Sequence, residues 1–333
     1  MTHPTLVFVG RRLLHAIPVM LIVAVAVFAI MEAAPGDAVD AYLGSLGGGD
    51  AGLAEQLRSQ WGLDQPVLVR FLAYLRSIVT LDLGWSTSVG MPVTQAILLR
   101  LPTTILLMGS AIAMSALLGV LLGGIAALRR GRLTDRVLTA GGLVLNAVPG
   151  FWLGLILIVV FVVWLGWFPN AGLASINGPT DPLGHALDVA WHLVLPVTTL
   201  ALTYMALYLR LMRGAMVETS QSTWVRAARA RGLSDARIVR QHIARPALLP
   251  VVTMLGLQAG VMLGGSVVIE TVFAIPGLGS LAYLAVSNRD LPLVAGIVLA
   301  GTLMVIVVNL VVDLSYARID PRVADEHLRT GVG

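Results

Sequence analysis

Six long stretches without aspartate, glutamate, lysine or arginine constrain this chain more than any other feature. A helix needs about 20 apolar residues to cross the hydrocarbon core of a bilayer, with about 17 as the lower limit. Only 12% of the residues are charged, whereas a soluble domain has about 25%. The sequence therefore predicts an all-α integral membrane protein with six transmembrane helices. The six stretches are Leu13–Met31, Leu101–Leu128, Val137–Phe168, Leu193–Leu209, Val251–Ile269 and Leu291–Val312.

Two of these stretches need separate interpretation. The third, of 32 residues, is longer than one crossing requires, and Pro149–Gly150 within it predicts a kinked or tilted helix, with a re-entrant segment as the alternative. The first stretch follows Arg11–Arg12 and partly resembles a signal peptide. Because a signal core has only about 7 to 15 residues, we interpret this stretch as a retained helix.

The arginines predict the orientation. All 22 basic residues are arginines. Six crossings place both termini on one side together with residues 129–136 and 210–250, and this side holds 17 of the 22 arginines. The arginine-rich side is therefore expected to be cytoplasmic, in the inner or plasma membrane of a prokaryotic cell. The high isoelectric point of the chain then reflects its orientation in the membrane. We therefore expect membrane lipid as a partner, and we do not expect nucleic acid.

The absence of lysine and cysteine excludes several kinds of chemistry. Without lysine the chain cannot form the phosphate-binding loop of an ATPase. Without cysteine it has neither a thiolate nucleophile nor a zinc–thiolate site. His185 and His192, in a predicted loop over residues 166–192, lack the companions of a metal site, and no metal is assigned. We therefore expect a non-catalytic chain.

The segment after the first stretch, residues 32–97, is predicted to be a small helical extracytoplasmic region. Asp64–Gln65–Pro66 precedes an amphipathic pattern that starts at Val67, which indicates a capped helix with proline in its first turn. A second short helix is expected over Ala51–Trp61, after a flexible loop at Gly47–Gly49. The alternative is a loop without fixed structure.

The segment between the fourth and fifth stretches, Thr223–His242, has the composition of a docking element. Its alanines favour helix, Gly232 suits a left-handed turn, and Ser234 can cap a second helix that begins at Asp235. Small alanines allow another surface to approach closely, while the arginines can meet acidic groups or phospholipid. The alternative is a basic loop that only follows the charge bias of cytoplasmic segments.

On these residues the chain resembles the membrane-spanning permease subunits of bacterial ABC importers, in the dipeptide/oligopeptide/nickel branch. The family's coupling loop reads Glu-Ala-Ala, three residues and Gly, and Arg226–Gly232 keeps the two alanines and the glycine, with arginine in place of the glutamate. Pro246 stands where asparagine is frequent. Further motifs of the branch match Gly62–Pro66, Leu81–Ser86, His242–Pro250, Glu270–Gly279, Arg289–Pro292 and Asn309–Arg322.

The resemblance implies a type I importer permease and its partners. These are two ATPase subunits that hold ATP and Mg, a second homologous permease and an extracytoplasmic binding protein, with no cofactor on this chain. The implied organisation has four regions: the N-terminus with the first span (1–31), the extracytoplasmic helical segment (32–97), the permease transmembrane domain (98–316) and a cytoplasmic tail (317–333). Within the permease domain the spans lie near 101–128, 137–168, 193–211, 251–273 and 291–314, and the coupling loop covers 212–250. The implied coupling residues are Trp224, Arg226, Ala227, Ala228, Arg229, Arg231, Gly232, Ser234 and Asp235.

Polar or kinking residues in or beside the spans are candidates for the pathway or its gate, and interhelical pairing is the alternative for all of them. They are Asn146, Pro149, Gln258, Glu270, Asn309 and Asp313. A secondary transporter or channel driven by an ion gradient would place several carboxylates or histidines deep in the spans. A membrane protease would have a zinc-binding His pair or paired acids. The sequence shows neither pattern, and it leaves peptides, nickel chelates, glutathione-like molecules and haem-type ligands open as cargo.

Overall fold

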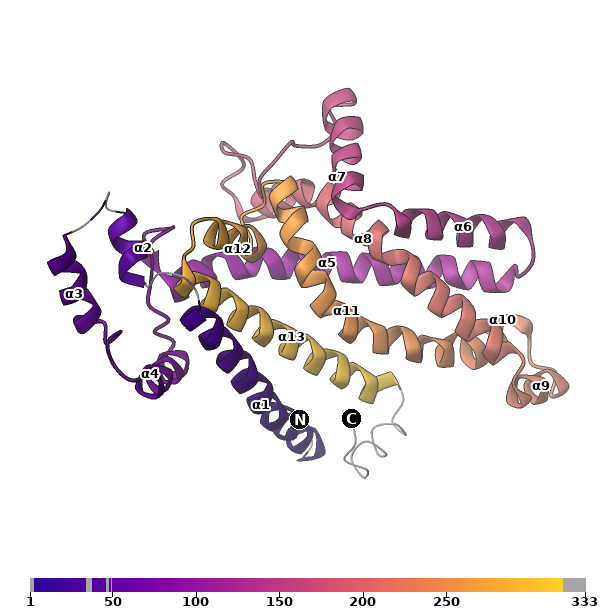
Figure 1. Ribbon diagram of the computed structural model, residues 1–333. Helices are drawn as coiled ribbons and strands as arrows, with labels where there is room; N and C mark the ends of the chain where they lie inside the picture. The colour runs from indigo at the N-terminus through magenta and orange to yellow at the C-terminus, as the bar shows by residue number, and fades with distance from the viewer. Residues whose placement is uncertain (1–2, 34–37, 46–47, 49, 320–333) are drawn as a thin grey trace. The chain divides into compact units, whose positions relative to one another are not determined.

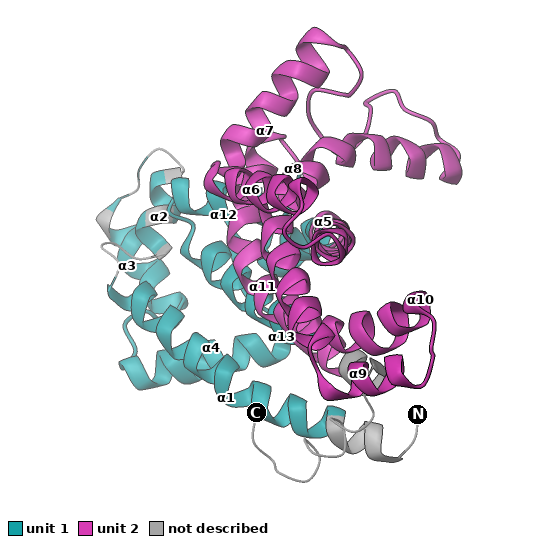
Figure 2. Ribbon diagram, turned by 90° about the vertical axis from the view of Figure 1, so that its right-hand side faces the viewer, with its two compact units in different colours: residues 1–104, 276–307 teal, residues 105–275, 308–333 magenta. Residues whose placement is uncertain are grey.

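The computed structural model describes residues 3–33, 38–45, 48 and 50–319, almost all of them helical (Figure 1). The predicted loop at Gly47–Gly49 lies mostly outside the described residues, as does the tail with Asp320–Pro321–Arg322. The chain forms two compact units (Figure 2): residues 1–104 with 276–307, and residues 105–275 with 308–333. Helices α5 (Val93–Leu128) and α13 (Leu291–Ile319) contribute to both.

The first unit contains the segment predicted to be extracytoplasmic, and this segment is helical as expected. Its elements are α1 (His3–Ala33), α2 (Ala38–Ser45), α3 (Ala51–Gln60), α4 (Val67–Thr80), the antiparallel pair β1 (Trp85–Ser86) and β2 (Met91–Pro92), and α12 (Leu278–Ser287). Helices α3 and α4 confirm the two predicted helices, whereas α2, the hairpin and α12 had no prediction. The expected cap of α4 is wrong, because Pro66 occupies the N-cap position and no side chain bonds there.

Two motifs far apart in the sequence meet in this unit. The buried Asp290 carboxylate accepts hydrogen bonds from the Ser86 hydroxyl at 2.6 Å and the Ser88 N–H at 3.0 Å. The same carboxylate accepts the Leu293 N–H at 3.2 Å and so caps the start of α13. One buried acid thereby joins the hairpin to a predicted membrane span.

The second unit is organised around α8 (Pro182–Ser220), which packs against α6, α7 and α11. Helices α5 and α8 also approach closely, because Gly119 and Gly123 of α5 lie against the backbone of α8 around Met205 and Leu209. Small residues four apart permit such close contact between membrane helices. The other elements are α6 (Leu133–Ala147), α7 (Gly150–Ile158), the π-helical η1 (Val159–Trp164), α9 (Thr223–Ala230), α10 (Asp235–Arg237), the π-helical η2 (Ile238–Ala244) and α11 (Arg245–Val272).

Among the described residues, four helices are long and apolar enough to cross a membrane, and two bent pairs raise the number to six if each pair is one span. The predicted count of six agrees with this upper value. The predicted kink in the third stretch is a break of 98° between α6 and α7 (Figure 1). Pro149 causes it, because a residue before proline avoids the helical conformation and Val148 is extended, with ψ 127°.

The predicted loop over residues 166–192 is wrong from Pro182 onward, where α8 already begins. The Asp181 carboxylate accepts the Gly184 N–H at 2.7 Å and caps the helix, with Pro182 in its first turn. At its other end α8 continues past the predicted limit of the span to Ser220. The fifth span also starts early, since helix is continuous from Asp235 through Pro246. Much of the predicted loop 212–250 is therefore helical.

Candidate coupling site

Helix α9 is held by a buried apolar cluster, which we call the α9 cluster. Val225 and Ala228 supply the α9 side chains, Ile238 and Ile243 come from η2, and α8 and α11 supply the rest. Its members are Tyr208, Met212, Met216, Val225, Ala228, Ile238, Ile243, Ala247 and Val251. Because interiors of this kind are close-packed, α9 cannot move without displacing the ends of α8 and α11.

The π-helical conformation of η2 explains how it reaches this cluster. Ile238 and Ile243 are five residues apart, and both are buried. In an α-helix that spacing places two side chains on different faces, whereas the wider turn of a π-helix, with its i to i+5 bonds, aligns them. A search of the sequence for helical periodicity therefore misses this contact.

The opposite face of α9 is exposed and mostly cationic. The Trp224 side chain is 55% exposed, and its indole N–H donates to the His242 carbonyl at 3.5 Å. The arginines of the predicted site, Arg226, Arg229 and Arg231, are also exposed. Of the alanine pair, Ala227 faces outward and Ala228 lies in the cluster. Ala228 thus anchors α9 from inside and is not available to a docking partner.

Gly232 ends α9 in the predicted left-handed turn. Its φ is +75°. The Gly232 N–H donates to the Arg229 carbonyl at 2.9 Å, and the Leu233 N–H donates to the Ala228 carbonyl at 3.3 Å. These two bonds form a Schellman motif and satisfy the last carbonyls of the helix.

The predicted side-chain cap at Ser234 is wrong, although the helix start is right. Ser234 has the extended backbone of an N-cap residue, but its hydroxyl makes no capping hydrogen bond. Asp235 begins α10 as predicted, and its carboxylate is exposed in the first turn. A negative charge at that position is favourable beside the positive end of the helix dipole.

An ion pair that the sequence interpretation missed links α6 to α8. Arg213 Nε lies 2.5 Å from Asp135 Oδ1, and its Nη2 lies 2.8 Å from Oδ2. Asp135 is buried, and it also accepts the Gly131 N–H at 2.9 Å. One feature of the sequence could have predicted this ion pair: Asp135 is the one acid in residues 129–136, which contain four arginines.

The six candidate pathway residues lie at separate places. Asn146 and Pro149 are exposed beside the break between α6 and α7. Gln258 and Glu270 are buried on α11, with Glu270 0% exposed near its C-terminal end. Asn309 and Asp313 are half-buried, one turn apart on α13.

Asn309 has a close neighbour on another helix. Its Oδ1 lies so near Gly256 of α11 that a Cβ built at this glycine would be 2.9 Å away. This contact favours a packing role for Asn309.

One of the two histidines in residues 166–192, His192, has a structural partner. His192 Nδ1 lies 2.8 Å from the Asp188 carbonyl oxygen. The Asp188 carboxylate accepts both the N–H and the hydroxyl of Ser175, at 2.7 and 2.8 Å, and so fixes the preceding loop to α8. Within the described part of the chain, no three His, Cys, Asp or Glu side chains gather in a way that could hold a metal ion.

The chain is similar in sequence to known membrane transport proteins. Residues 119–325 match the family described as binding-protein-dependent transport system inner membrane component, and residues 5–108 match the N-terminal component of the same systems. The oligopeptide transport system permease protein AppB of Bacillus subtilis is 36% identical over 318 residues, 95% of this chain and 98% of AppB. The di/tripeptide transport system permease protein DppB of Pseudomonas aeruginosa is 39% identical over 331 residues, 95% of this chain and 98% of DppB.

Solved structures share the fold at low sequence identity. A structure of the MetNI methionine ABC transporter in inward-facing conformations has a TM-score of 0.54 and 17% identity, over 68% of this chain and 97% of that one. An amino acid ABC transporter with histidines has a TM-score of 0.50 and 18% identity, over 68% and 94%. These similarities confirm the expected fold of an importer permease. Together with the sequence relatives, they favour a permease over a transporter driven by an ion gradient.

Proposed function

The chain belongs to the family of binding-protein-dependent transport system inner membrane components, and from this premise we propose that it forms one half of an ATP-driven import pathway for peptides. It is a multi-pass permease subunit of an ABC importer, and this role implies ATPase and substrate-binding partners. We propose two ATPase subunits, which hold ATP and Mg, a second homologous permease, and a binding protein on the outer side.

The observation that carries the peptide assignment is the extent of the similarity to peptide permeases. AppB and DppB each align with 95% of this chain, and they are permease proteins of oligopeptide and di/tripeptide transport systems, respectively. Co-purification of the complex with its binding protein, followed by mass spectrometry of the retained ligand, tests this assignment. We expect a mixture of short peptides. A retained metal chelate or haem-type molecule would contradict it.

We propose that α9 couples the ATPase to the membrane helices. Its exposed Trp224 and arginines suit a groove with acidic groups, because complementary charge favours docking and fixes its orientation. The α9 cluster then transmits movement to α8 and α11 as a close-packed solid. Under this proposal the arginine-rich side, with both termini, is the cytoplasmic side, where the ATPases are.

Replacing Gly232 by valine is expected to uncouple the complex. A residue with a side chain at φ +75° is destabilised by about 1–2 kcal/mol. β-Branched residues such as valine adopt positive φ values least readily. The turn must therefore change and move α9 against its partner. We expect substrate-stimulated ATP hydrolysis by the complex in proteoliposomes to fall by about five- to thirtyfold, since each 1.4 kcal/mol is a factor of ten.

Gly166→Val is the matched control. Gly166 has φ +63°, and like Gly232 it has no atom within 4 Å of a built Cβ, so both substitutions introduce the same backbone strain. Gly166 lies after η1, far along the chain from α9. Coupling should therefore persist in Gly166→Val. Normal coupling in Gly232→Val, with the complex intact, would refute the role of α9.

A further inference from the structure

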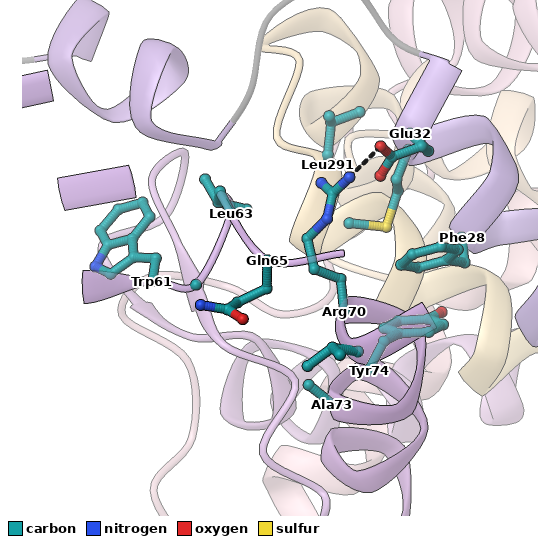
Figure 3. A pocket seen from close by; sticks show the side chains of 12 residues that line it. Phe28, Glu32, Trp61, Leu63, Gln65, Arg70, Ala73, Tyr74 and Leu291 are labelled. Carbon is teal, nitrogen blue, oxygen red and sulfur yellow. Dashed lines mark hydrogen bonds and ion pairs between the residues drawn. The ribbon is translucent and has the colours of Figure 1, made fainter. Parts of the chain in front are cut away.

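A cavity of about 400 Å³ lies within the first unit, between the C-terminal end of α1, the connection from α3 to α4, and α4 itself (Figure 3). Most of its wall is apolar, with Phe28 and Met31 from α1 and Val69 and Ala73 from α4. Trp61 and Leu63 stand on the side of the connection. The coupling mechanism does not use this cavity.

One wall of the cavity carries both signs of charge. The Arg70 guanidinium donates from Nη2 to Glu32 Oε1, and Figure 3 shows the two groups facing one another. Arg70 Nε is buried, and no group in the described part of the chain accepts its hydrogen. A buried donor without an acceptor is unfavourable by about 1–3 kcal/mol. The hydrogen on Arg70 Nε thus still lacks an acceptor oxygen in this wall.

The sequence indicates that the cavity lies near the boundary between hydrocarbon and water. Glu32 directly follows the charge-free stretch Leu13–Met31, so its carboxylate is at the level of the headgroups. Phe28 and Met31 belong to the last turn of that stretch and lie at the hydrocarbon boundary. A ligand that fills the cavity therefore meets charge at one end and apolar side chains at the other.

The outer face of α4 indicates which surface lies beside the cavity. Leu68, Leu72 and Val79 fall within about 40° of one another at 100° per residue, and they are 69%, 57% and 83% exposed. An adjacent face of α4 packs on α1, where the rings of Phe28 and Phe71 meet edge to face with centroids 5.2 Å apart. An exposed apolar stripe beside the end of a membrane span is typical of a helix that lies in the membrane interface.

From these observations we propose that the cavity binds a zwitterionic phospholipid, phosphatidylethanolamine, by its headgroup. The phosphate accepts from Arg70, including the buried Nε, and the ammonium donates to Glu32. The acyl chains follow the exposed apolar face of α1, which includes Ile22 and Val25. The choline headgroup has no N–H and cannot donate to Glu32. A water-soluble zwitterion such as a peptide has no acyl chains and would leave this apolar face of α1 without a partner.

The test measures lipid binding to the delipidated, purified complex by native mass spectrometry. Four probes are compared: phosphatidylethanolamine, phosphatidylcholine, glycerophosphoethanolamine without acyl chains, and dialanine. We expect phosphatidylethanolamine to bind at least fivefold more tightly than phosphatidylcholine, and the two water-soluble probes not to compete. Equal binding of both lipids, or displacement of lipid by dialanine, would overturn the proposal.

Variants locate the site. Arg70→Gln and Glu32→Gln should each weaken phosphatidylethanolamine binding at least tenfold. Arg76→Gln is the control, because Arg76 is an exposed arginine on the same helix that does not line the cavity. A tenfold loss in the control, or no loss in the other two, would contradict the assignment. If a variant fails to assemble, the comparison of lipids on the unaltered protein still decides. Since no cargo or ATP is present, the result is independent of the proposed transport function.

Discussion

Replacing Gly119 by leucine is expected to prevent α5 from packing on α8 and so to abolish folding of the second unit. A Cβ built at Gly119 would lie 2.4 Å from Tyr208 Cβ and 2.9 Å from the Met205 carbonyl oxygen. One turn further along α5, a Cβ at Gly123 would lie 2.5 Å from the Leu209 carbonyl oxygen. Backbone atoms cannot move aside as a flexible side chain can, so the helices must separate along the whole contact.

The expected loss exceeds about 3 kcal/mol, the upper end for overpacking a core. The measurement is the yield of folded, detergent-extracted chain and its resistance to unfolding by SDS. Gly109→Leu is the control, because Gly109 is on the same helix and a Cβ there has no atom within 4 Å. The control should retain the yield of the unaltered protein. An equal yield of Gly119→Leu would show that α5 and α8 do not depend on this close contact.

Features set by local chemistry were predictable from the sequence. The spans follow from the absence of charge over about 20 residues, and the left-handed turn follows from a glycine between two helix-forming segments. Both depend only on neighbours in the chain. Helix α9 (Thr223–Ala230) was predictable for the same reason, because its alanines favour helix and Gly232 follows its last turn.

Features set by distant partners were not predictable. The carboxylate of Asp290 meets Ser86 across 204 residues, so neither motif alone indicates the pairing. Ala227 and Ala228 look equivalent in sequence, yet only Ala228 meets the π-helical segment η2 in the α9 cluster. The early start of α8 was a different failure, since Asp181–Pro182 is a recognisable N-terminal signal that the high proline content of the preceding loop obscured.

Helix α8 carries the connections through which the coupling helix can act. Tyr208 belongs to the α9 cluster and also touches Gly119 of α5. Arg213, between Met212 and Met216 of the same cluster, holds Asp135 of α6. A displacement of α9 therefore reaches α5, α6 and α11 through one rigid helix, and each contact is a place where the transmission can be interrupted.

The ion pair between Asp135 and Arg213 is expected to be the most sensitive polar contact in this unit. Removing one partner of a buried pair costs about 3–5 kcal/mol, because the other charge is left without compensation. Asp135→Asn should therefore destabilise the chain by about 3 kcal/mol, the lower end, since the Arg213 side chain is 31% exposed. Arg213→Lys keeps the charge but loses the two-point contact, so its effect should be smaller.

A double-mutant cycle with Asp135→Asn and Arg213→Gln measures the pair directly by unfolding in SDS. We expect the double variant to be more stable than the sum of the single effects implies, with a coupling energy of about 1–3 kcal/mol. Arg210→Gln is the control, because Arg210 is exposed one turn earlier on α8 and should change stability by less than about 0.5 kcal/mol. Additive single effects would mean that Asp135 is stabilised mainly by the Gly131 N–H and that α6 is not held to α8 by charge.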